Sequence, residues 1–156
     1  MRKPLAVATL VVITAAALLP SQAQAKTPRM GPTIEGYFSA RNAGTQYCLD
    51  ASASQGVRLQ PCNSESTYQQ WRRVAAAGPL EHLNSSGDCL DASASAGVTL
   101  KRCNGSIYQN WSFDLEARQW VHRQSNKVLD ASISQGVAIK APDFTSPYQE
   151  WTNLNR

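Results

Sequence analysis

The chain has 156 residues, with 15 Lys or Arg against 11 Asp or Glu and a formal net charge of +4. This length suits one domain. Because the basic residues are scattered along the chain rather than grouped in blocks, the sequence argues against nucleic-acid binding.

The first 25 residues are typical of a secretory signal peptide. Arg2 and Lys3 precede an apolar stretch, Leu5–Leu19, which is short for a membrane span, and no other apolar candidate follows it. Ala23-Gln24-Ala25 then places small residues on either side of a glutamine, as signal peptidase requires. We therefore expect a secreted, extracellular protein without a membrane span, in which residues 26–32 form a flexible leader before the fold.

One ten-residue phrase occurs three times, at residues 48–57, 89–98 and 128–137, and Tyr-Gln-x-Trp follows each copy. A period of about 40 residues indicates a repeat architecture. Three copies are too few for a closed propeller of four or more blades, so they favour a small fold with internal threefold symmetry. We place the repeats at residues 33–76, 77–117 and 118–156.

Within each repeat the sequence predicts strands and turns rather than helices. Short apolar or alternating runs are separated by clusters of Gly, Ser, Asn and Pro, which predicts four short strands per repeat and an all-β fold. A glycine precedes a valine in each copy, where a positive φ before a strand is expected. The tryptophans of Gln-x-Trp are expected in the core, with the glutamine amide bonded to backbone. These residues are Gly56, Gly97 and Gly136, and Trp71, Trp111 and Trp151.

Four cysteines in a secreted chain indicate disulfides. Cys48 and Cys62 are 14 residues apart, as are Cys89 and Cys103, whereas the third repeat lacks a cysteine at both matching positions. Pairing across repeats would leave one cysteine without a partner, so this joint loss predicts the bonds Cys48–Cys62 and Cys89–Cys103.

Acid and base candidates do not converge on a catalytic site. His82 and His122 occupy matching positions in their repeats, and we take Ala40 as their counterpart in the first repeat. Residues related by threefold symmetry lie far apart, so the two histidines form no dyad. No Gly-x-Ser-x-Gly motif and no metal-binding spacing of His and Cys is present. We therefore predict a non-catalytic protein with no metal and no cofactor.

Cys-Leu-Asp, Gly-Val, a second Cys and Gln-x-Trp, repeated in phase, resemble the ricin B-type β-trefoil lectins. The resemblance extends over nearly all of the chain that follows the predicted signal peptide. The segment Cys103–Trp111 is also similar to repeats of the actinohivin-like mannose-binding lectins. The resemblance implies a β-trefoil with pseudo-threefold symmetry and one shallow sugar pocket in each repeat.

The resemblance also implies a role for four positions in each repeat. An aspartate accepts hydrogen bonds from sugar hydroxyls, an asparagine follows the second cysteine, a tyrosine precedes Gln-x-Trp, and the glutamine supports the aspartate from beneath. The ligand-binding residues implied are Asp50, Asn63, Tyr68 and Gln69; Asp91, Asn104, Tyr108 and Gln109; and Asp130, Asp143, Tyr148 and Gln149.

The same residue types suit a sugar on physical grounds, because a carboxylate, an amide and a ring can meet vicinal hydroxyls and a C–H face. The alternative is that each aspartate only stabilises a turn, since Asp-x-Ser segments bond their own backbone. Three positions depart from the sugar-binding patterns. Galactose-binding relatives usually have an asparagine directly before Gln-x-Trp, where this chain has tyrosine. Galactose-binding relatives have an aromatic platform where this chain has Gln60, Lys101 and Lys140, and mannose-binding relatives have a tyrosine where it has Arg58, Thr99 and Ala138.

The sequence thus predicts a secreted, non-catalytic carbohydrate-binding lectin with up to three shallow sites. It leaves open whether the glycan is mannose-type or galactose-type, and the cations near the sites add anionic glycans to the choices. Two alternatives keep the same fold. One is a protein-binding adaptor, targeting subunit or inhibitor that has lost sugar binding, and the other is a binder of cell-wall polysaccharide.

Overall fold

The computed structural model describes residues 36–73, 75–85 and 87–155. The predicted signal peptide and leader lie outside these residues. The first repeat comprises β1 (Phe38–Asn42), β2 (Tyr47–Ser52), β3 (Gly56–Pro61), the 3-10 turn η1 (Thr67–Gln69) and β4 (Trp71–Arg73). The second comprises β5 (Ala77–Gly78), β6 (Leu80–His82), β7 (Asp88–Ser93), β8 (Gly97–Arg102), η2 (Ile107–Gln109) and β9 (Trp111–Asp114). The third comprises β10 (Gln119–His122), β11 (Lys127–Ser132), β12 (Gly136–Lys140), η3 (Pro147–Gln149) and β13 (Trp151–Asn155).

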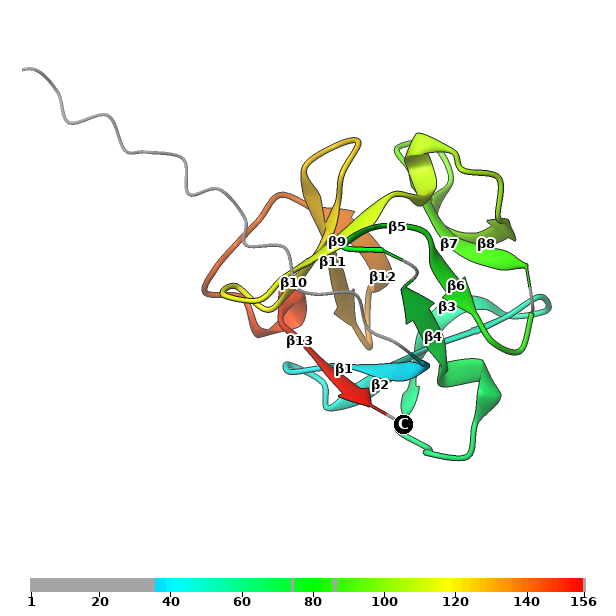
Figure 1. The fold of residues 1–156 in the computed structure, drawn as a ribbon. Helices are drawn as coiled ribbons and strands as arrows, with labels where there is room; N and C mark the ends of the chain where they lie inside the picture. Colours follow the sequence, from blue (N-terminus) through cyan, green and yellow to red (C-terminus); the bar gives the residue numbers. More distant parts are fainter. Residues whose placement is uncertain (1–35, 74, 86, 156) are drawn as a thin grey trace, which may run out of the picture.

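The predicted all-β trefoil is confirmed, and its strands join the repeats to one another. Apart from the two-residue β5, which pairs with β9, the last strand of each repeat pairs antiparallel with the first strand of the next, as β4 with β6 and β9 with β10. The third repeat closes on the first, because β13 pairs with β1 from Phe38 opposite Asn155 to Asn42 opposite Trp151 (Figure 1). No repeat therefore completes its own sheet, and the three fold as one body.

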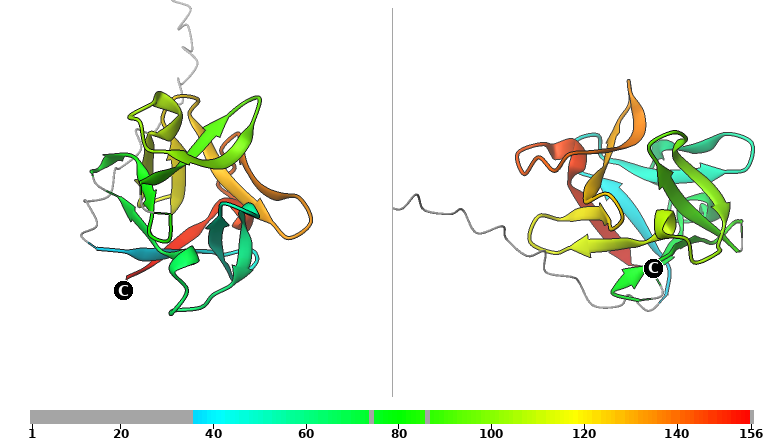
Figure 2. Two further views of the ribbon diagram at one scale, coloured as in Figure 1. Left: turned by 90° about the vertical axis from the view of Figure 1, so that its right-hand side faces the viewer. Right: turned by 90° about the horizontal axis from the view of Figure 1, so that it is seen from above.

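The middle two strands of each repeat form a hairpin: β2–β3, β7–β8 and β11–β12. Strands β3, β8 and β12 contact one another, so the three hairpins converge, as the views of Figure 2 allow the reader to follow. The glycine that begins the second strand of each hairpin has a positive φ, as predicted from the sequence. These values are 69° for Gly56, 70° for Gly97 and 73° for Gly136.

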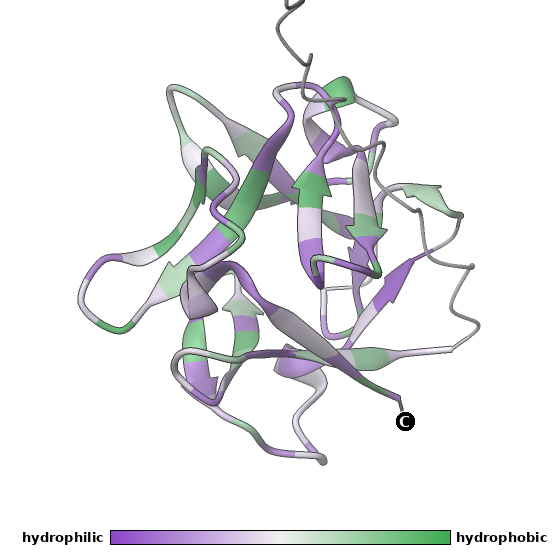
Figure 3. Cartoon of the chain, turned by 90° about the vertical axis from the view of Figure 1, so that its left-hand side faces the viewer, coloured by the Kyte–Doolittle hydropathy of each residue, from purple (hydrophilic) through white to green (hydrophobic). Residues whose placement is uncertain are grey.

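The core contains all four tryptophans, each fully buried. Apolar and polar residues alternate along the strands around it (Figure 3). The indole N–H of each Gln-x-Trp tryptophan donates to the backbone carbonyl of a leucine on the hairpin. These bonds join Trp71 to Leu49 (3.0 Å), Trp111 to Leu90 (2.8 Å) and Trp151 to Leu129 (3.0 Å). The fourth, Trp120, stacks on Phe38 with ring centroids 5.6 Å apart.

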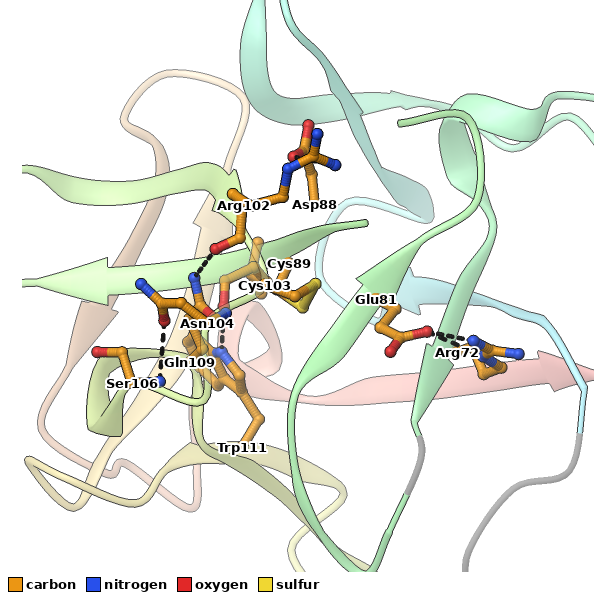
Figure 4. The surroundings of a disulfide bond; sticks show 11 residues. Arg72, Glu81, Asp88, Cys89, Arg102, Cys103, Asn104, Ser106, Gln109 and Trp111 are labelled. Carbon is orange, nitrogen blue, oxygen red and sulfur yellow. Dashed lines mark hydrogen bonds and ion pairs between the residues drawn. A yellow bond between two sulfur atoms is a disulfide. The ribbon is translucent and has the colours of Figure 1, made fainter. Parts of the chain in front are cut away.

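Both predicted disulfides are present, Cys48–Cys62 and Cys89–Cys103. Each connects the beginning of one hairpin to the loop that follows it (Figure 4). In the third repeat a buried valine, Val128, stands in the place of the first cysteine. That hairpin therefore relies on apolar packing where the others are cross-linked.

The strand register corrects one equivalence drawn from the sequence. Asn42, not Ala40, is the first-repeat counterpart of the histidines, because Asn42 lies opposite Trp151 as His82 lies opposite Trp71 and His122 opposite Trp111. Asn42, His82 and His122 have the same 40-residue spacing as Trp71, Trp111 and Trp151, so the repeat period also gives Asn42, and the prediction of Ala40 is wrong. Ala40 instead corresponds to Leu80 and Trp120, two residues before the histidines on their strands.

Replacing Cys89 and Cys103 with alanine should lower the free energy of unfolding by about 3 kcal/mol, because the disulfide restricts a loop of about 15 residues in the unfolded chain. The variant should still fold, since the third repeat forms the same hairpin without a disulfide. Urea unfolding would measure the loss. The C48A/C62A variant is the matched control and should lose a similar amount, since its cysteines have the same separation. A loss below about 1 kcal/mol in both would contradict this account.

Candidate functional site

The repeat aspartates lie in the middle of β2, β7 and β11 and are almost fully buried. Asp50 is 3% exposed, Asp91 2% and Asp130 4%. A buried carboxylate requires a compensating partner, because removing an unpaired charge from water is costly. Each of the three has such a partner, and it is a cation from the adjacent strand of the same hairpin.

The three ion pairs are similar in length but arise from two different positions. Arg58 Nη2 lies 2.6 Å from Asp50 Oδ1, Lys101 Nζ lies 2.8 Å from Asp91 Oδ1, and Lys140 Nζ lies 2.9 Å from Asp130 Oδ1. Arg58 is directly opposite Asp50 in the strand register. Lys101 is opposite Cys89, two residues before Asp91, and Lys140 is likewise opposite Val128, two residues before Asp130.

Three of the residues that depart from the sugar-binding patterns, Arg58, Lys101 and Lys140, therefore share one role. The two positions differ from repeat to repeat, but together they provide one cation per repeat, and it reaches the aspartate each time. The Arg58 contact is an ion pair whose angle lies outside hydrogen-bond geometry, whereas Lys101 donates a hydrogen bond to Asp91. Among the described residues, no donor reaches the second carboxylate oxygen of Asp91 or Asp130, which leaves that oxygen able to accept from a ligand.

The three tyrosines are exposed in the middle of the 3-10 turns. Tyr68 is 43% exposed, Tyr108 41% and Tyr148 44%. The ring of Tyr148 lies against the β1–β2 turn, where a Cβ added at Gly44 would come within 2.7 Å of the ring carbon Cδ1. A glycine is therefore required at this turn. Each tyrosine offers an apolar face to solvent from a turn whose backbone is fixed on both sides.

The residues after the second cysteine form turns with their own backbone. The side-chain oxygens of Asn63, Asn104 and Asp143 each accept a hydrogen bond of 2.9 Å from the backbone N–H two residues later. For Asp143 the Thr145 hydroxyl donates as well, and this bond together with the backbone N–H of Thr145 lowers the pKa of the carboxyl. The predicted ligand contact from these residues would have to be made alongside this turn function.

The glutamines bond the loop that carries these turns, and they do not bond the aspartates. Gln109 Oε1 accepts from the Asn104 N–H (3.0 Å), and its Nε2 donates to the Arg102 carbonyl (3.0 Å; Figure 4). Gln69 makes the same two bonds to Asn63 and Pro61, and Gln149 makes them to Asp143 and Ala141. The glutamine side chain therefore holds the loop, which agrees with the backbone bonding expected from the sequence.

Two further features are absent from the described part of the chain. It contains no group of three or more His, Cys, Asp or Glu placed to hold a metal ion. It also contains no helix with the length and apolar character needed to cross a membrane. What recurs in every repeat is a buried carboxylate with a cation, an exposed tyrosine, and a loop fixed by a glutamine.

Replacing Gln109 with leucine keeps the side-chain volume but removes both bonds to the loop. We expect the free energy of unfolding to fall by about 1–3 kcal/mol, because the Asn104 N–H and the Arg102 carbonyl lose their partner. Chemical denaturation would measure the loss. Gln124→Leu, on an exposed turn, is the control and should change the free energy by less than about 0.5 kcal/mol. Equal effects of the two changes would rule out the loop-holding role.

Comparison with known proteins agrees with this geometry. The model of the ricin-type β-trefoil lectin domain matches residues 36–151. No curated protein matches the chain. A non-toxic homologue of type II RIPs from Momordica charantia, solved in complex with α-methyl-D-galactoside, has a TM-score of 0.68 at 20% identity over 79% of this chain. The match covers 48% of that protein, so this chain corresponds to less than half of its length.

Two other solved structures share this fold. The hemolytic lectin CEL-III is 27% identical with a TM-score of 0.65, and the match covers 79% of this chain and 31% of that one. ThreeFoil, a designed threefold-symmetric protein, is 22% identical with a TM-score of 0.62, and the match covers 78% of this chain and all of its own. Because the family model covers nearly all of the described fold, this chain belongs to the ricin-type β-trefoil lectin family.

Proposed function

We propose that this protein is a secreted, non-catalytic lectin that binds glycans through up to three equivalent shallow sites. The observation that carries the proposal is the repetition, in every repeat, of a buried aspartate paired with a cation. The pairs are Asp50–Arg58, Asp91–Lys101 and Asp130–Lys140. The signal-peptide pattern of the first 25 residues supports secretion.

A paired carboxylate and cation suit a sugar diol. A hydroxyl group is both donor and acceptor, so one hydroxyl can donate to the carboxylate while it or its neighbour accepts from the ammonium or guanidinium. Such charge-assisted bonds are stronger than those between neutral groups. The exposed tyrosine face then offers a surface for the apolar C–H face of the sugar ring. The cation thus provides polar recognition in place of the aromatic platform that the sequence lacks.

The ion pair also bears on the charge of the ligand. Each cation lies beside a carboxylate, so each pair has no net charge. The free cation that would favour a sialylated or phosphorylated glycan is therefore absent from these three pairs. Uncharged sugars with vicinal hydroxyls, of the mannose or galactose type, fit this arrangement better. The α-methyl-D-galactoside bound by the Momordica charantia relative is of this uncharged kind.

The same geometry supports a non-catalytic role. A glycosidase of the common type needs two carboxyl groups flanking one bond, roughly 5–10 Å apart. Here each hairpin presents one buried aspartate, and that aspartate is engaged by a cation. The pockets therefore offer hydrogen bonding but no acid–base pair.

A second candidate is the protein-binding adaptor or targeting subunit. Its support is apolar exposure that is greatest in the third repeat, where Phe144 is 78% exposed and Ile133 69% exposed. The matching residue to Ile133 in each of the other repeats is an alanine, Ala53 and Ala94. This apolar exposure favours contact with another macromolecule, but it is not repeated threefold as the aspartate–cation pairs are.

Changing both Asp50 and Asp91 to asparagine should abolish most glycan binding, and the single change Asp91→Asn should reduce it in part, because the remaining repeats still bind. Asparagine keeps the shape but removes the charge of the acceptor. A glycan array with the chain from Lys26 onward would measure this. Asp114→Asn, at the end of β9 and outside the hairpins, is the matched control and should bind as the wild type does.

Wild-type binding by the correctly folded double variant would exclude these pockets as the site. If the wild-type protein itself binds no glycan, the adaptor becomes the better account. Affinity capture of a secreted partner that is lost on Phe144→Ser would then support it.

On the same array, uncharged glycans should give stronger signals than their sialylated forms, because each cation is already paired with a carboxylate. The measurement is a comparison of matched glycans before and after sialidase treatment. A clear preference for the sialylated member would mean that the ligand displaces the aspartate from its cation. That result would contradict the proposed mode of binding while leaving the lectin function intact.

A further inference from the structure

One residue on the first strand of each repeat bonds the backbone of the exposed tyrosine in the preceding repeat. His82 Nε2 lies 3.0 Å from the Tyr68 carbonyl, and His122 Nε2 lies 3.2 Å from the Tyr108 carbonyl. Between the third repeat and the first, an amide takes the place of the imidazole, and Asn42 Nδ2 donates to the Tyr148 carbonyl at 2.8 Å. Each tyrosine-bearing turn is therefore held from the next repeat around the threefold axis.

The other polar atom of the same three side chains bonds the turn that follows its own strand. Asn42 Oδ1 accepts from the Thr45 N–H (3.1 Å), and His82 Nδ1 accepts from the Ser85 N–H (3.2 Å). His122 Nδ1 lies 2.9 Å from the Ser125 hydroxyl. A neutral imidazole with its proton on Nε2 thus places one donor and one acceptor where the asparagine amide places them.

The Ser85 contact fixes the protonation state of His82. A backbone N–H can only donate, so Nδ1 must carry a lone pair and the ring must be neutral. A proton added at Nδ1 would face the Ser85 N–H, and one of the two groups would have to move. His122 differs in this respect, because the Ser125 hydroxyl can rotate and accept a bond from Nδ1–H.

The surroundings of both histidines are partly apolar. His82 lies on the ring of Trp71, with centroids 4.8 Å apart, and His122 lies on Trp111 at 5.0 Å. Burial is the main influence on both rings, and it lowers their pKa values below the usual 6.5. For each histidine the tyrosine carbonyl raises the pKa in the opposite direction, though less strongly.

The charged groups that face these rings come from neighbouring hairpins. Asp50 on β2 and Asp88 on β7 act on His82, and Asp91 on β7 acts on His122. Two of these are the site aspartates, and each already has its cation, Arg58 or Lys101. Each histidine therefore lies near both the aspartate and the tyrosine of one proposed pocket, that of the preceding repeat.

We propose that His82, His122 and Asn42 are the positioning residues of the three glycan pockets, and that acid weakens the first pocket most, the second less and the third not at all. The inference rests on the proposed function, since it names what holds each pocket. Protonating His82 puts a charge in a partly apolar site and breaks the Ser85 bond, so the ring moves and releases the Tyr68 turn. Protonating His122 also puts a charge in a partly apolar site, but it breaks no bond to a backbone N–H. Asn42 does not titrate.

The first test needs no ligand. Nuclear magnetic resonance of the protein with labelled tyrosine rings would be followed from about pH 8 to about pH 5, across the ordinary histidine pKa of about 6.5. The Tyr68 signal should shift or broaden most, Tyr108 less, and Tyr148 should stay constant. His82→Asn should remove the response of Tyr68, and Asn42→His should create one at Tyr148.

These two variants are matched, because each installs a side chain that the fold already uses at the equivalent place. A Tyr68 signal that stays constant with pH in the wild-type protein would overturn the proposal. A response of Tyr68 that persists in H82N would overturn it as well. Should H82N fail to fold, N42H decides alone, since a Tyr148 signal that still ignores pH would refute the positioning role.

The second test measures binding, with α-methyl-D-galactoside and α-methyl-D-mannoside as probes at the same two pH values. The affinity of the first pocket should fall about tenfold or more at the lower pH, which corresponds to one unit of pKa coupling. H82N should bind equally at both pH values in that pocket. If neither sugar binds at any pH while the tyrosine signals respond as described, the lectin proposal fails and the positioning role stands. If sugars bind without any pH dependence, the lectin proposal stands and the positioning role fails.

Discussion

The indole N–H of each Gln-x-Trp tryptophan bonds the carbonyl of the leucine that directly precedes a site aspartate. This bond connects the core to the surface. The ring is fully buried and cannot shift without opening a cavity, so it fixes the backbone of the hairpin at that leucine. The aspartate that follows the leucine is therefore held in place as well. The glutamine two residues before the tryptophan holds the loop on the other side of the proposed pocket. The Gln-x-Trp segment therefore positions both sides of each proposed site.

The two sources of the cation follow from strand geometry. Residues two apart on a strand face the same side, so Arg58 and Lys101, which occupy different positions, both project toward the aspartate of their own hairpin. The requirement at the site is one positive charge within reach of a buried carboxylate, and either position satisfies it. What is kept in all three repeats is thus an interaction, while the residue that makes it changes.

The fold and the disulfides could be predicted from the sequence because both depend on the repeat. In-phase copies of the Asp and Trp motifs define the symmetry, and the joint absence of both cysteines from the third copy defines the pairing. The ion pairs could not be predicted in this way. They cross from one strand to the next, and their register is visible only when Asp91 is seen opposite Thr99 and Lys101 opposite Cys89. When the three repeats are aligned, Arg58, Thr99 and Ala138 occupy one position and share no property that would indicate a common role.

The equivalence of Asn42 with the histidines was missed for a related reason. Asparagine and histidine share no charge and no ring, so the common 40-residue spacing of Asn42, His82 and His122 does not by itself suggest a shared role. Their likeness is in the placement of a donor and an acceptor, which depends on the bonds to Tyr148 and Thr45 rather than on the letters of the sequence. Repeats that have different residues at such a position can therefore still make the same hydrogen bonds there.

The third repeat shows how far the surface can vary once these bonds are kept. It has lost its disulfide, has gained Pro142 and Pro147, and exposes Phe144, yet its ion pair and its glutamine bonds match those of the other repeats. The backbone of the pocket is therefore constant while its rim is free to differ. In a rigid body whose individual sites are shallow, useful affinity depends on several sites engaging one branched or clustered ligand at fixed spacing. Under the proposed function, constant backbone geometry maintains that spacing, and differences at the rim of each proposed site decide which branch it accepts.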